Sequence, residues 1–336
     1  MRYLSLADTE RLDLRMSEVV PVVEHAFRLA AQGRAVVAPR LRLVHPPLSE
    51  GSLGDGRPWL RNVRLVPGGL EGIGFAVRVG AGLSDGGPSS LVARGVALLF
   101  FDWERMELRA VISDHLVHAV RSTAPNGVLA KHLALEDADT LGLIGSGRLA
   151  RWAAEAVAAV RPLRRVRVWS PSPEHRLECV GYLRARGRAG LDVTAVASPE
   201  EAVRGAQVVV TATNARGPVL DGRWLEPGAT VISNRPEELD RATLLRGRIV
   251  TTYREGVLGH VPPYRALLDL LASGELGPDA FATELADVIV GRAPGRARAD
   301  EVIVCLNPAY GLLDAATADY VYREAVRAGV GLELGA

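Results

Sequence analysis

One stretch decides the fold, and it reads Asp139-Thr140-Leu141-Gly142-Leu143-Ile144-Gly145-Ser146-Gly147-Arg148-Leu149-Ala150-Arg151-Trp152. An apolar run comes first, then the turn Gly145-x-Gly147-x-x-Ala150, and then the start of an alanine-rich amphipathic segment. In a dinucleotide-binding fold the first glycine permits a tight turn, the second lets the backbone approach a pyrophosphate, and the third small residue lets helix and strand pack closely. Backbone N–H groups and the positive helix end then face the phosphates. The stretch therefore predicts a strand, a phosphate-binding turn and a helix.

The residues that follow support this prediction. A second strand at 165–169 ends just before Ser170, close to the offset of about 20 residues at which a ribose-reading residue follows the turn. Alternating strands and helices predict right-handed crossovers and a parallel sheet. We therefore expect an α/β fold with a Rossmann nucleotide-binding domain. The other elements expected there are strands at 192–196, 208–213, 230–233, 248–252 and 302–305, and helices at 153–160, 199–203 and 238–245.

Composition excludes several classes of protein. Of the 336 residues, 48% are hydrophobic and 24% charged, which is typical of a globular protein. A net charge of +1 provides no strong field for nucleic acid or for an anionic membrane. Two cysteines leave neither a disulfide framework nor a thiolate metal site to be expected. No apolar run is long enough to span a bilayer and no signal-peptide pattern begins the chain, so we expect a cytoplasmic protein without a metal.

The residues before the glycine turn predict a separate, strand-rich α+β domain. We place this substrate-binding and dimerisation domain at 1–120, completed by a C-terminal helix within 310–336, and the nucleotide-binding domain at 121–309. A long loop is expected at 46–58 from its proline and glycine content. The expected elements are a strand at 3–6, a helix ending at Gly33, extended segments at 36–44, 60–65, 72–79, 90–102 and 107–112, and helices at 114–132 and 313–328.

Several runs along the chain have a distinctive sequence. They are Ala119-Val120-Arg121-Ser122-Thr123-Ala124, Leu129-Ala130-Lys131-His132-Leu133, the glycine strand, Trp224-Leu225-Glu226-Pro227-Gly228-Ala229-Thr230, Asn234-Arg235-Pro236 with Glu238-Leu239, and Asn307-Pro308-Ala309-Tyr310-Gly311-Leu312-Leu313-Asp314. Together these runs resemble the ornithine cyclodeaminase/mu-crystallin family over nearly the whole chain. The last run is most similar to the branch of the family that makes N-(1-amino-1-carboxyethyl)glutamate. The resemblance implies an NAD(P)-dependent homodimer that acts at the Cα–N bond of an amino acid or imine.

The resemblance also implies arginines that bind the substrate. Arg121 matches the family's carboxylate-binding arginine, and either Arg40 or Arg42 matches a second one. A guanidinium suits a carboxylate because its planar fork can bind both oxygens. Arg78 stands where the family carries a catalytic lysine; it can bind a carboxylate or polarise a carbonyl, but it is a poor general base because it does not lose its proton. These arginines suggest a substrate with more than one anionic or carbonyl group.

The proton carrier is open at this point. Asn234 stands where cyclodeaminases carry an aspartate, and an amide can hydrogen-bond but cannot exchange a proton at neutral pH. Ornithine cyclodeamination is therefore disfavoured. His260, in the loop Gly259-His260-Val261-Pro262-Pro263-Tyr264, is the candidate to test first. The other candidates are His45, Asp85, His118 and Tyr310.

Coenzyme contacts are expected around the glycine turn and at the ends of the strands. The expected residues are Gly145, Ser146, Gly147, Arg148, Leu149, Ser170, Ser172, Arg176, Thr211, Ala212, Thr213 and Asn307. An acid at position 170 would bind the ribose hydroxyls and repel a 2′-phosphate. Ser170 does not repel it, and hydroxyls with Arg176 could bind it. We therefore expect NADP(H) to be favoured over NAD(H).

Three functions fit this pattern. The first is an NAD(P)H-dependent imine reductase or amino-acid dehydrogenase, in specialised metabolism or elsewhere. The second is an NADP-binding, ligand-binding protein of mu-crystallin type without turnover. The third is a cyclodeaminase or lyase that recycles its nicotinamide internally. All three predict a small-molecule amino-acid or imine ligand, and none involves nucleic acid or a membrane.

Overall fold

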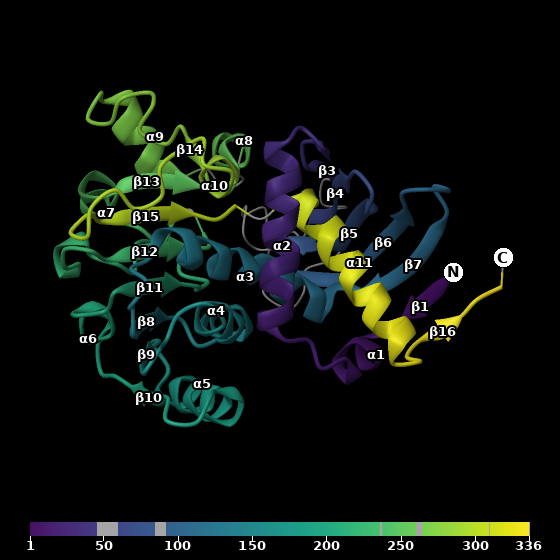
Figure 1. Ribbon diagram of the computed structural model, residues 1–336, viewed down its shortest axis with the longest axis horizontal. Helices are drawn as coiled ribbons and strands as arrows, with labels where there is room; N and C mark the ends of the chain where they lie inside the picture. The colour runs from purple at the N-terminus through teal and green to yellow at the C-terminus, as the bar shows by residue number, and fades with distance from the viewer. Residues whose placement is uncertain (46–59, 85–91, 236, 260–263, 309, 336) are drawn as a thin grey trace. The chain divides into compact units, whose positions relative to one another are not determined.

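The computed structural model describes residues 1–45, 60–84, 92–235, 237–259, 264–308 and 310–335 (Figure 1). The chain forms two compact units. The first unit comprises 1–14, 32–121 and 310–336, and the second comprises 15–31 and 122–309. Residues 15–31 therefore cluster with the second unit, whereas the sequence placed them in the first.

The first unit is built on a mixed sheet that is antiparallel except for the parallel pair of β1 and β7. Its strand order is β16-β1-β7-β6-β5-β4-β2, and β3 pairs with β4. Helix α11 packs on strands β4, β5 and β6. The elements are β1 (Arg2–Leu4), α1 (Leu6–Arg11), β2 (Ala35–Val37), β3 (Leu41–His45), β4 (Leu60–Leu70), β5 (Gly74–Ser84), β6 (Val92–Asp102), β7 (Leu108–Ser113), the first part of α3 (Asp114–Leu133), α11 (Gly311–Arg327) and β16 (Leu332–Glu333).

Strand β4 is longer than the sequence predicted, because its last residues, which include a proline and two glycines, pair with β5 and lie against the start of α11. The expected strand stopped at Leu65, but pairing continues through Pro67 and Gly68 to Leu70. A Cβ atom on Gly68 would lie 2.3 Å from the backbone carbon of Gly311, so only glycine lets α11 begin against this strand. The first turn of α11 is thereby fixed on the face of β4 to which Gly68 belongs.

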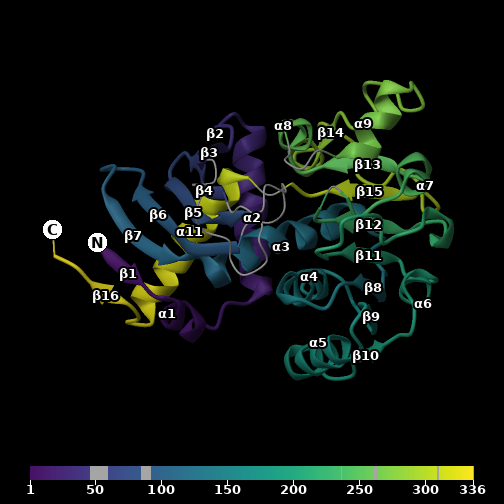
Figure 2. The ribbon, with the colours of Figure 1, turned by 180° about the vertical axis from the view of Figure 1, so that it is seen from behind.

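The second unit is a parallel sheet with helices on both faces, which confirms the predicted fold class. Its strand order is β10-β9-β8-β11-β12-β15-β13-β14, and every pairing is parallel. Figures 1 and 2 show α4 and α5 on one face and α6 and α7 on the other. The elements are α2 (Met16–Ala31), the rest of α3, β8 (Thr140–Ile144), α4 (Arg148–Ala158), β9 (Arg165–Trp169), α5 (Pro173–Arg186), β10 (Asp192–Ala195), α6 (Pro199–Val203), β11 (Val208–Thr211), η1 (Gly222–Trp224), β12 (Thr230–Ser233), α7 (Arg241–Arg246), β13 (Arg248–Thr251), α8 (Arg254–Leu258), α9 (Arg265–Ala272), β14 (Thr283–Glu284), α10 (Leu285–Ile289) and β15 (Ile303–Leu306).

The central strands of the second unit are buried on both sides. Ile144, Val209, Val231 and Val304 come from β8, β11, β12 and β15 and are fully or almost fully inaccessible. Continuous apolar strands of this kind are typical of parallel sheets. Strand β8 lies between β9 and β11, so the strand order reverses direction there, and ligands of such sheets bind at the carboxyl ends beside this point. Among the described helices, none combines the length and the apolar character needed to cross a bilayer.

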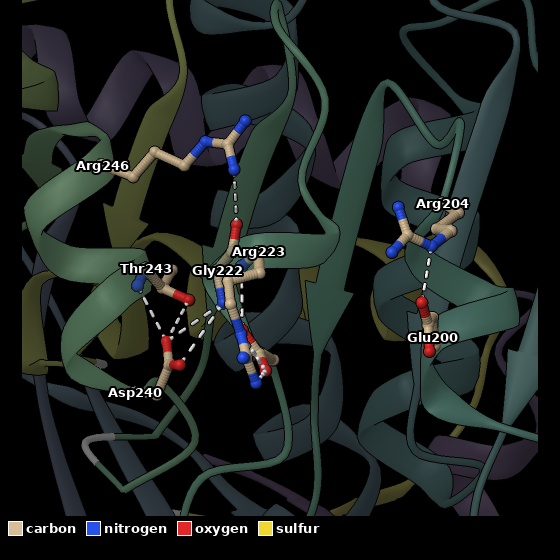
Figure 3. Close-up of polar contacts among 8 residues, drawn as sticks. Glu200, Arg204, Gly222, Arg223, Asp240, Thr243 and Arg246 are labelled. Carbon is tan, nitrogen blue, oxygen red and sulfur yellow. Dashed lines mark hydrogen bonds and ion pairs between the residues drawn. The ribbon is translucent and has the colours of Figure 1, made fainter.

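Helix α7 begins later than the sequence predicted, and Asp240 is the reason. The Asp240 carboxylate accepts a hydrogen bond from the Thr243 backbone N–H at 2.8 Å and from its hydroxyl at 2.6 Å, and it also accepts one from the Gly222 N–H (Figure 3). An N-cap aspartate of this kind begins a helix at the next residue. Glu238, expected to be helical, is therefore left outside α7.

Candidate functional site

The glycine turn has the geometry of a phosphate-binding turn. Gly145 has φ of 118°, and a Cβ atom there would lie 2.3 Å from the Ala212 carbonyl oxygen. Gly147 caps α4 without a side-chain hydrogen bond, the first turn of α4 carries no acid, and nothing lies within 4 Å of a Cβ atom on Gly147. The N–H groups of α4 are thus open to an anion, as a pyrophosphate requires.

Hydrogen bonds from serine and arginine side chains hold the glycine turn against the end of β9 and helix α4. Ser146 Oγ donates to Ser170 Oγ at 2.9 Å, and Ser170 Oγ donates to the Ser172 carbonyl at 3.2 Å. Arg151 Nε donates to the Ser146 carbonyl at 3.1 Å. The turn and the end of β9 therefore form one hydrogen-bonded unit, and Arg151 also pairs with Glu178 of α5 at 3.3 Å.

The arginines expected to bind phosphate differ in their surroundings. Arg148 is exposed on the first turn of α4, next to the half-buried Leu149. Arg176 donates through Nη1 to the Val196 carbonyl, so part of its guanidinium is held by the backbone after β10. Ser172 Oγ accepts from the His175 N–H and caps α5.

A buried carboxylate orders the segment after β11. Glu238 is fully buried and accepts hydrogen bonds from Thr211 Oγ1 at 2.8 Å, from the Thr213 N–H at 2.5 Å and from Ser233 Oγ at 3.2 Å. Burial raises the pKa of Glu238, while the Thr213 and Thr211 hydrogen bonds act in the opposite direction. Glu238 thus links the carboxyl end of β11 to that of β12. Ala212, which lies between the Thr211 and Thr213 contacts, is buried.

An amide network lies at the same edge of the sheet. Asn307 Nδ2 is 3.0 Å from the Ser122 carbonyl, 2.9 Å from Asn126 Oδ1 and 3.0 Å from Asn234 Oδ1. Asn234 Nδ2 donates to the Thr211 carbonyl at 3.0 Å. These contacts join the ends of β11, β12 and β15 to helix α3.

Backbone carbonyls settle which way each amide points. A carbonyl can only accept, so the Asn307 atom facing Ser122 O must be nitrogen, and the Asn234 atom facing Thr211 O must be nitrogen as well. Both polar ends of Asn234 are therefore bound by the protein. Asn234 therefore joins neighbouring strands. Its Nδ2 atom is bound to the Thr211 carbonyl and its Oδ1 atom to Asn307, so both groups already have partners within the protein.

The first unit gathers arginines on one face of its sheet. Arg42 and Arg64 are directly opposite each other in the antiparallel pair of β3 and β4, so their side chains share a face. Gly80 lies opposite Arg64 on β5, and Arg78 lies two residues away on that same face. The Arg78 Nη1 atom is 3.9 Å from the Cβ position of Gly80, which places its guanidinium over the strand toward Arg64.

Two buried aspartates hold the arginines at this face. Arg78 Nε donates to Asp114 at the start of α3, and Arg121 Nε lies 3.0 Å from Asp314 Oδ1 in the first turn of α11. Asp314 is fully buried, and burial raises its pKa to about 6 although Arg121 and Arg78 act to lower it. Arg121 is 3% exposed; its Nε atom is paired with Asp314, and its Nη1 atom has no hydrogen-bond partner among the described residues.

The remaining expected residues are less well placed or lie elsewhere. Arg40 is exposed, although its charge is close enough to interact unfavourably with Arg121, Arg78 and Arg42. His260 and Asp85 fall outside the described residues, as does the side chain of His45. The expected residues Arg42, Arg78 and Arg121 are thus brought together in the first unit.

Sequence reasoning missed Arg64, Asp114, Glu238, Asn126 and the site role of Asp314. The signal for Arg64 was present: Arg42 and Arg64 face each other if the two strands form a hairpin, but the register could not be set across the loop at 46–59. The Asp314 carboxylate lay in a quoted motif, but only the packing of α11 on the sheet brings it to Arg121.

A family model for ornithine cyclodeaminase and mu-crystallin matches residues 3–329. The chain belongs to this family. A putative dehydrogenase of Rhizobium meliloti is 30% identical over 98% of both chains. The Δ1-pyrroline-2-carboxylate reductase of Paracoccus denitrificans is 29% identical over 76% of this chain and 80% of its own.

The structures of relatives agree with this membership. Thermococcus litoralis Δ1-pyrroline-2-carboxylate reductase, solved with NADH and L-proline, aligns with a TM-score of 0.83 and 26% identity over 99% of this chain and 100% of its own. The family predicted from the sequence is therefore confirmed.

Proposed function

We propose that this family member is a nicotinamide-dependent oxidoreductase that acts on the carbon–nitrogen bond of an imine or amino acid. The observation that carries the proposal is the pair of anion-binding features: a helix end at Gly147 without a side-chain cap, and a buried Arg121 whose Nη1 atom has no hydrogen-bond partner among the described residues. Several of its relatives are named Δ1-pyrroline-2-carboxylate reductases, and these names support this chemistry.

The second unit would hold the coenzyme. Backbone N–H groups of Ser146, Gly147 and the first turn of α4 would bind the pyrophosphate, Ser170 would face the adenosine ribose, and Thr211 to Thr213 with Asn307 would line the nicotinamide half. When bound, the coenzyme supplies or accepts the hydride. Glu238 and Asn234 fix the ends of β11 and β12, so these contacts are in place before the coenzyme arrives.

Arginines of the first unit would hold the substrate. Arg121 would bind the carboxylate next to the reacting carbon, and Asp314 keeps its guanidinium oriented. Arg78, held by Asp114, would add positive charge where negative charge builds up, but it would not act as a base. This arrangement stabilises an anionic substrate without using either arginine to move a proton.

The proton at nitrogen would be carried by His260 or Asp314. His260 is the sequence candidate, and Asp314 is a carboxyl in the arginine cluster whose pKa of about 6 is near neutral. If His260 carries the proton, His260→Gln abolishes turnover and leaves coenzyme affinity unchanged. If turnover of His260→Gln is unchanged and that of Asp314→Asn is lost, the role passes to Asp314.

NADP(H) would be favoured over NAD(H). Position 170 carries an uncharged serine where an acid would repel a 2′-phosphate, and Arg176 and the Ser172 hydroxyl would supply donors to that phosphate. Fluorescence titration should give a lower dissociation constant for NADPH than for NADH. Ser170→Asp should reverse that order, whereas tighter NADH binding by the unmodified protein would contradict the preference.

Consumption of coenzyme tests the proposed reaction. The purified protein is incubated with NADPH or NADH and a panel of cyclic imines and 2-oxo acid plus amine pairs. Net oxidation of the coenzyme by one pair is expected. Coenzyme binding without oxidation of the coenzyme by any pair would favour a ligand-binding protein. Product formed without net oxidation of the coenzyme would favour an internally recycled coenzyme.

We also propose that the protein is a homodimer, which light scattering during size-exclusion chromatography would detect.

A further inference from the structure

The arginine that holds the glycine turn is itself fixed by helix α5. Arg151 Nε donates to the Ser146 carbonyl at 3.1 Å, and Arg151 Nη2 donates to Glu178 Oε2 at 3.3 Å. The Arg151 guanidinium carbon lies 5.4 Å from the centre of the Tyr182 ring, which is a cation–π distance. Glu178 and Tyr182, both on α5, thereby keep Arg151 Nε directed at the Ser146 carbonyl.

The link between α4 and α5 does not depend on Arg151. Arg186 of α5 pairs through Nε with Glu155 of α4 at 2.9 Å, and its guanidinium carbon lies 5.3 Å from the centre of the Trp152 ring on α4. The Tyr182 hydroxyl also donates to Glu155, at 2.7 Å. These contacts join two helices that lie side by side in Figures 1 and 2. Arg151 differs from Arg186 in that its Nε contact leads to the carbonyl before the N-cap of α4.

The direction of the Ser146 carbonyl determines where the next N–H points. A trans peptide group is planar, and its C=O and N–H point in opposite directions. Because Arg151 draws the Ser146 oxygen toward α4, the Gly147 N–H points away from the helix. Among the described residues, no backbone oxygen accepts this N–H. It can therefore donate to an anion at the open end of α4.

Glycine at position 147 makes a second orientation of this peptide accessible. Gly147 has a φ of −74°, and half a turn of the peptide before it would make φ positive, which glycine adopts about as readily. The turned peptide would present the Ser146 oxygen to the anion instead of the Gly147 N–H. It would also lose the hydrogen bond from the charged Arg151 side chain, which is of the stronger kind. Arg151 thus favours the orientation that binds an anion.

We infer that Arg151 is a positioning residue for the pyrophosphate of the coenzyme. It holds the peptide between Ser146 and Gly147 so that the Gly147 N–H faces the phosphates, and it acts through that peptide instead of through a contact of its own. The inference rests on the proposed function and adds to its coenzyme site a residue outside the motif Gly145-x-Gly147-x-x-Ala150.

ADP and adenosine isolate the diphosphate, because they share the nucleoside and only ADP carries phosphates. Their dissociation constants are measured on the full chain by displacement of NADPH or NADH, whichever binds more tightly. Arg151→Gln should raise the dissociation constants of ADP and of the coenzyme about tenfold, since a hydrogen bond to the anion is lost. The dissociation constant of adenosine should stay nearly unchanged, so the ratio of the two constants reports on the diphosphate alone.

Arg186→Gln is the matched control. It removes an arginine from the same pair of helices, together with the contacts to Glu155 and Trp152, and it leaves Arg151 in contact with Ser146. If both arginines only held the helices together, both variants would bind ADP less tightly. The inference predicts that Arg186→Gln binds ADP as the unmodified protein does. Thermal unfolding verifies that each variant is folded.

Crystal structures show the peptide directly. In Arg151→Gln without coenzyme, the Ser146 oxygen should point to the open end of α4 in at least part of the molecules. In the unmodified protein with ADP, which needs no variant, a phosphate oxygen should accept from the Gly147 N–H while Arg151 Nε stays on the Ser146 carbonyl. A direct contact between Arg151 and a phosphate would overturn the positioning role.

Four other results would also overturn the inference. They are unchanged ADP affinity in Arg151→Gln, loss of ADP and adenosine affinity alike in that variant, an equal loss of ADP affinity in Arg186→Gln, and a peptide that keeps its orientation in Arg151→Gln. Failure of the unmodified protein to bind NADH and NADPH would defeat the proposed function, whereas these results with coenzyme bound to the unmodified protein defeat only the inference about Arg151.

Discussion

Replacing Asn234 by aspartate restores the residue type that cyclodeaminases carry, yet the structure predicts damage. Asn234 Nδ2 donates to the Thr211 carbonyl at 3.0 Å, and Asn234 Oδ1 accepts from Asn307. In Asn234→Asp an acceptor faces the Thr211 carbonyl. One hydrogen bond is lost and two acceptors are left opposed, which costs about 2–3 kcal/mol. For a domain of this size that lowers the unfolding midpoint by roughly 5–10 °C.

The loss should depend on pH in a definite direction. Burial and the facing carbonyl favour the protonated form of the new carboxyl, so its pKa in the folded protein lies above its value in the unfolded chain. The variant is then closest to the unmodified protein at low pH, and the difference in midpoint grows as pH rises through the raised pKa. Calorimetric scans at a series of pH values measure this difference, and coenzyme titration should show weaker binding.

Asn214→Asp is the matched control for this experiment. Asn214 is exposed in the segment after β11, so the same chemical change should alter stability by less than about 0.5 kcal/mol. An unchanged midpoint for Asn234→Asp, or a gain of cyclodeaminase activity, would refute the amide orientation from which the prediction is derived.

Three further predictions concern other groups. Glu238→Gln places an amide N–H₂ among the donors of Thr211 and Thr213, so stability should fall by about 1–3 kcal/mol and coenzyme binding should weaken; equal NADPH affinity would argue against its positioning role. Gly145→Ala should abolish coenzyme binding in fluorescence titrations, because its Cβ would lie 2.3 Å from the Ala212 carbonyl at a φ of 118°; retained binding would mean that the turn does not hold the pyrophosphate. The folded-state pKa of Asp314, about 6, is above its unfolded value, so its contribution to stability is fully present below about pH 4 and is lost as pH rises through about 6. Thermal unfolding should show this pH dependence in the unmodified protein and a smaller one in Asp314→Asn.

Local sequence signals predicted the second unit well. The glycine turn, the strands beside it and the helix after it depend on neighbours in the chain, and they formed where expected. The helix expected from Glu238 was wrong in its start, because the N-cap at Asp240 overrides helix propensity. The strand expected to stop at Leu65 continues to Leu70. Its residue Gly68 packs closely against Gly311, which is far along the chain and could not be paired with it from the sequence.

Candidate site residues could be named from the sequence where a single residue matches a family motif. They could not be named where strand register or helix packing determines which side chains meet. The resemblance to the family named Arg121, and either Arg40 or Arg42, as candidates, and these remain predictions. The opposition of Arg64 to Arg42 depends on strand register across a long loop, and the ion pair of Arg121 with Asp314 depends on where α11 packs. The role of Asn234 changed because its hydrogen-bond partners are backbone and amide groups from other strands, which no spacing in the sequence reveals.

Deuterium transfer tests the central claim most directly. The protein is incubated with NADPH or NADH deuterated at nicotinamide C4 and with an imine of the panel, and the product is analysed by mass spectrometry and NMR. We expect one deuterium per product molecule, on the carbon that carries the nitrogen, taken from one face of the coenzyme only. Unlabelled product, or coenzyme that binds but is never oxidised by any imine of the panel, would contradict the account.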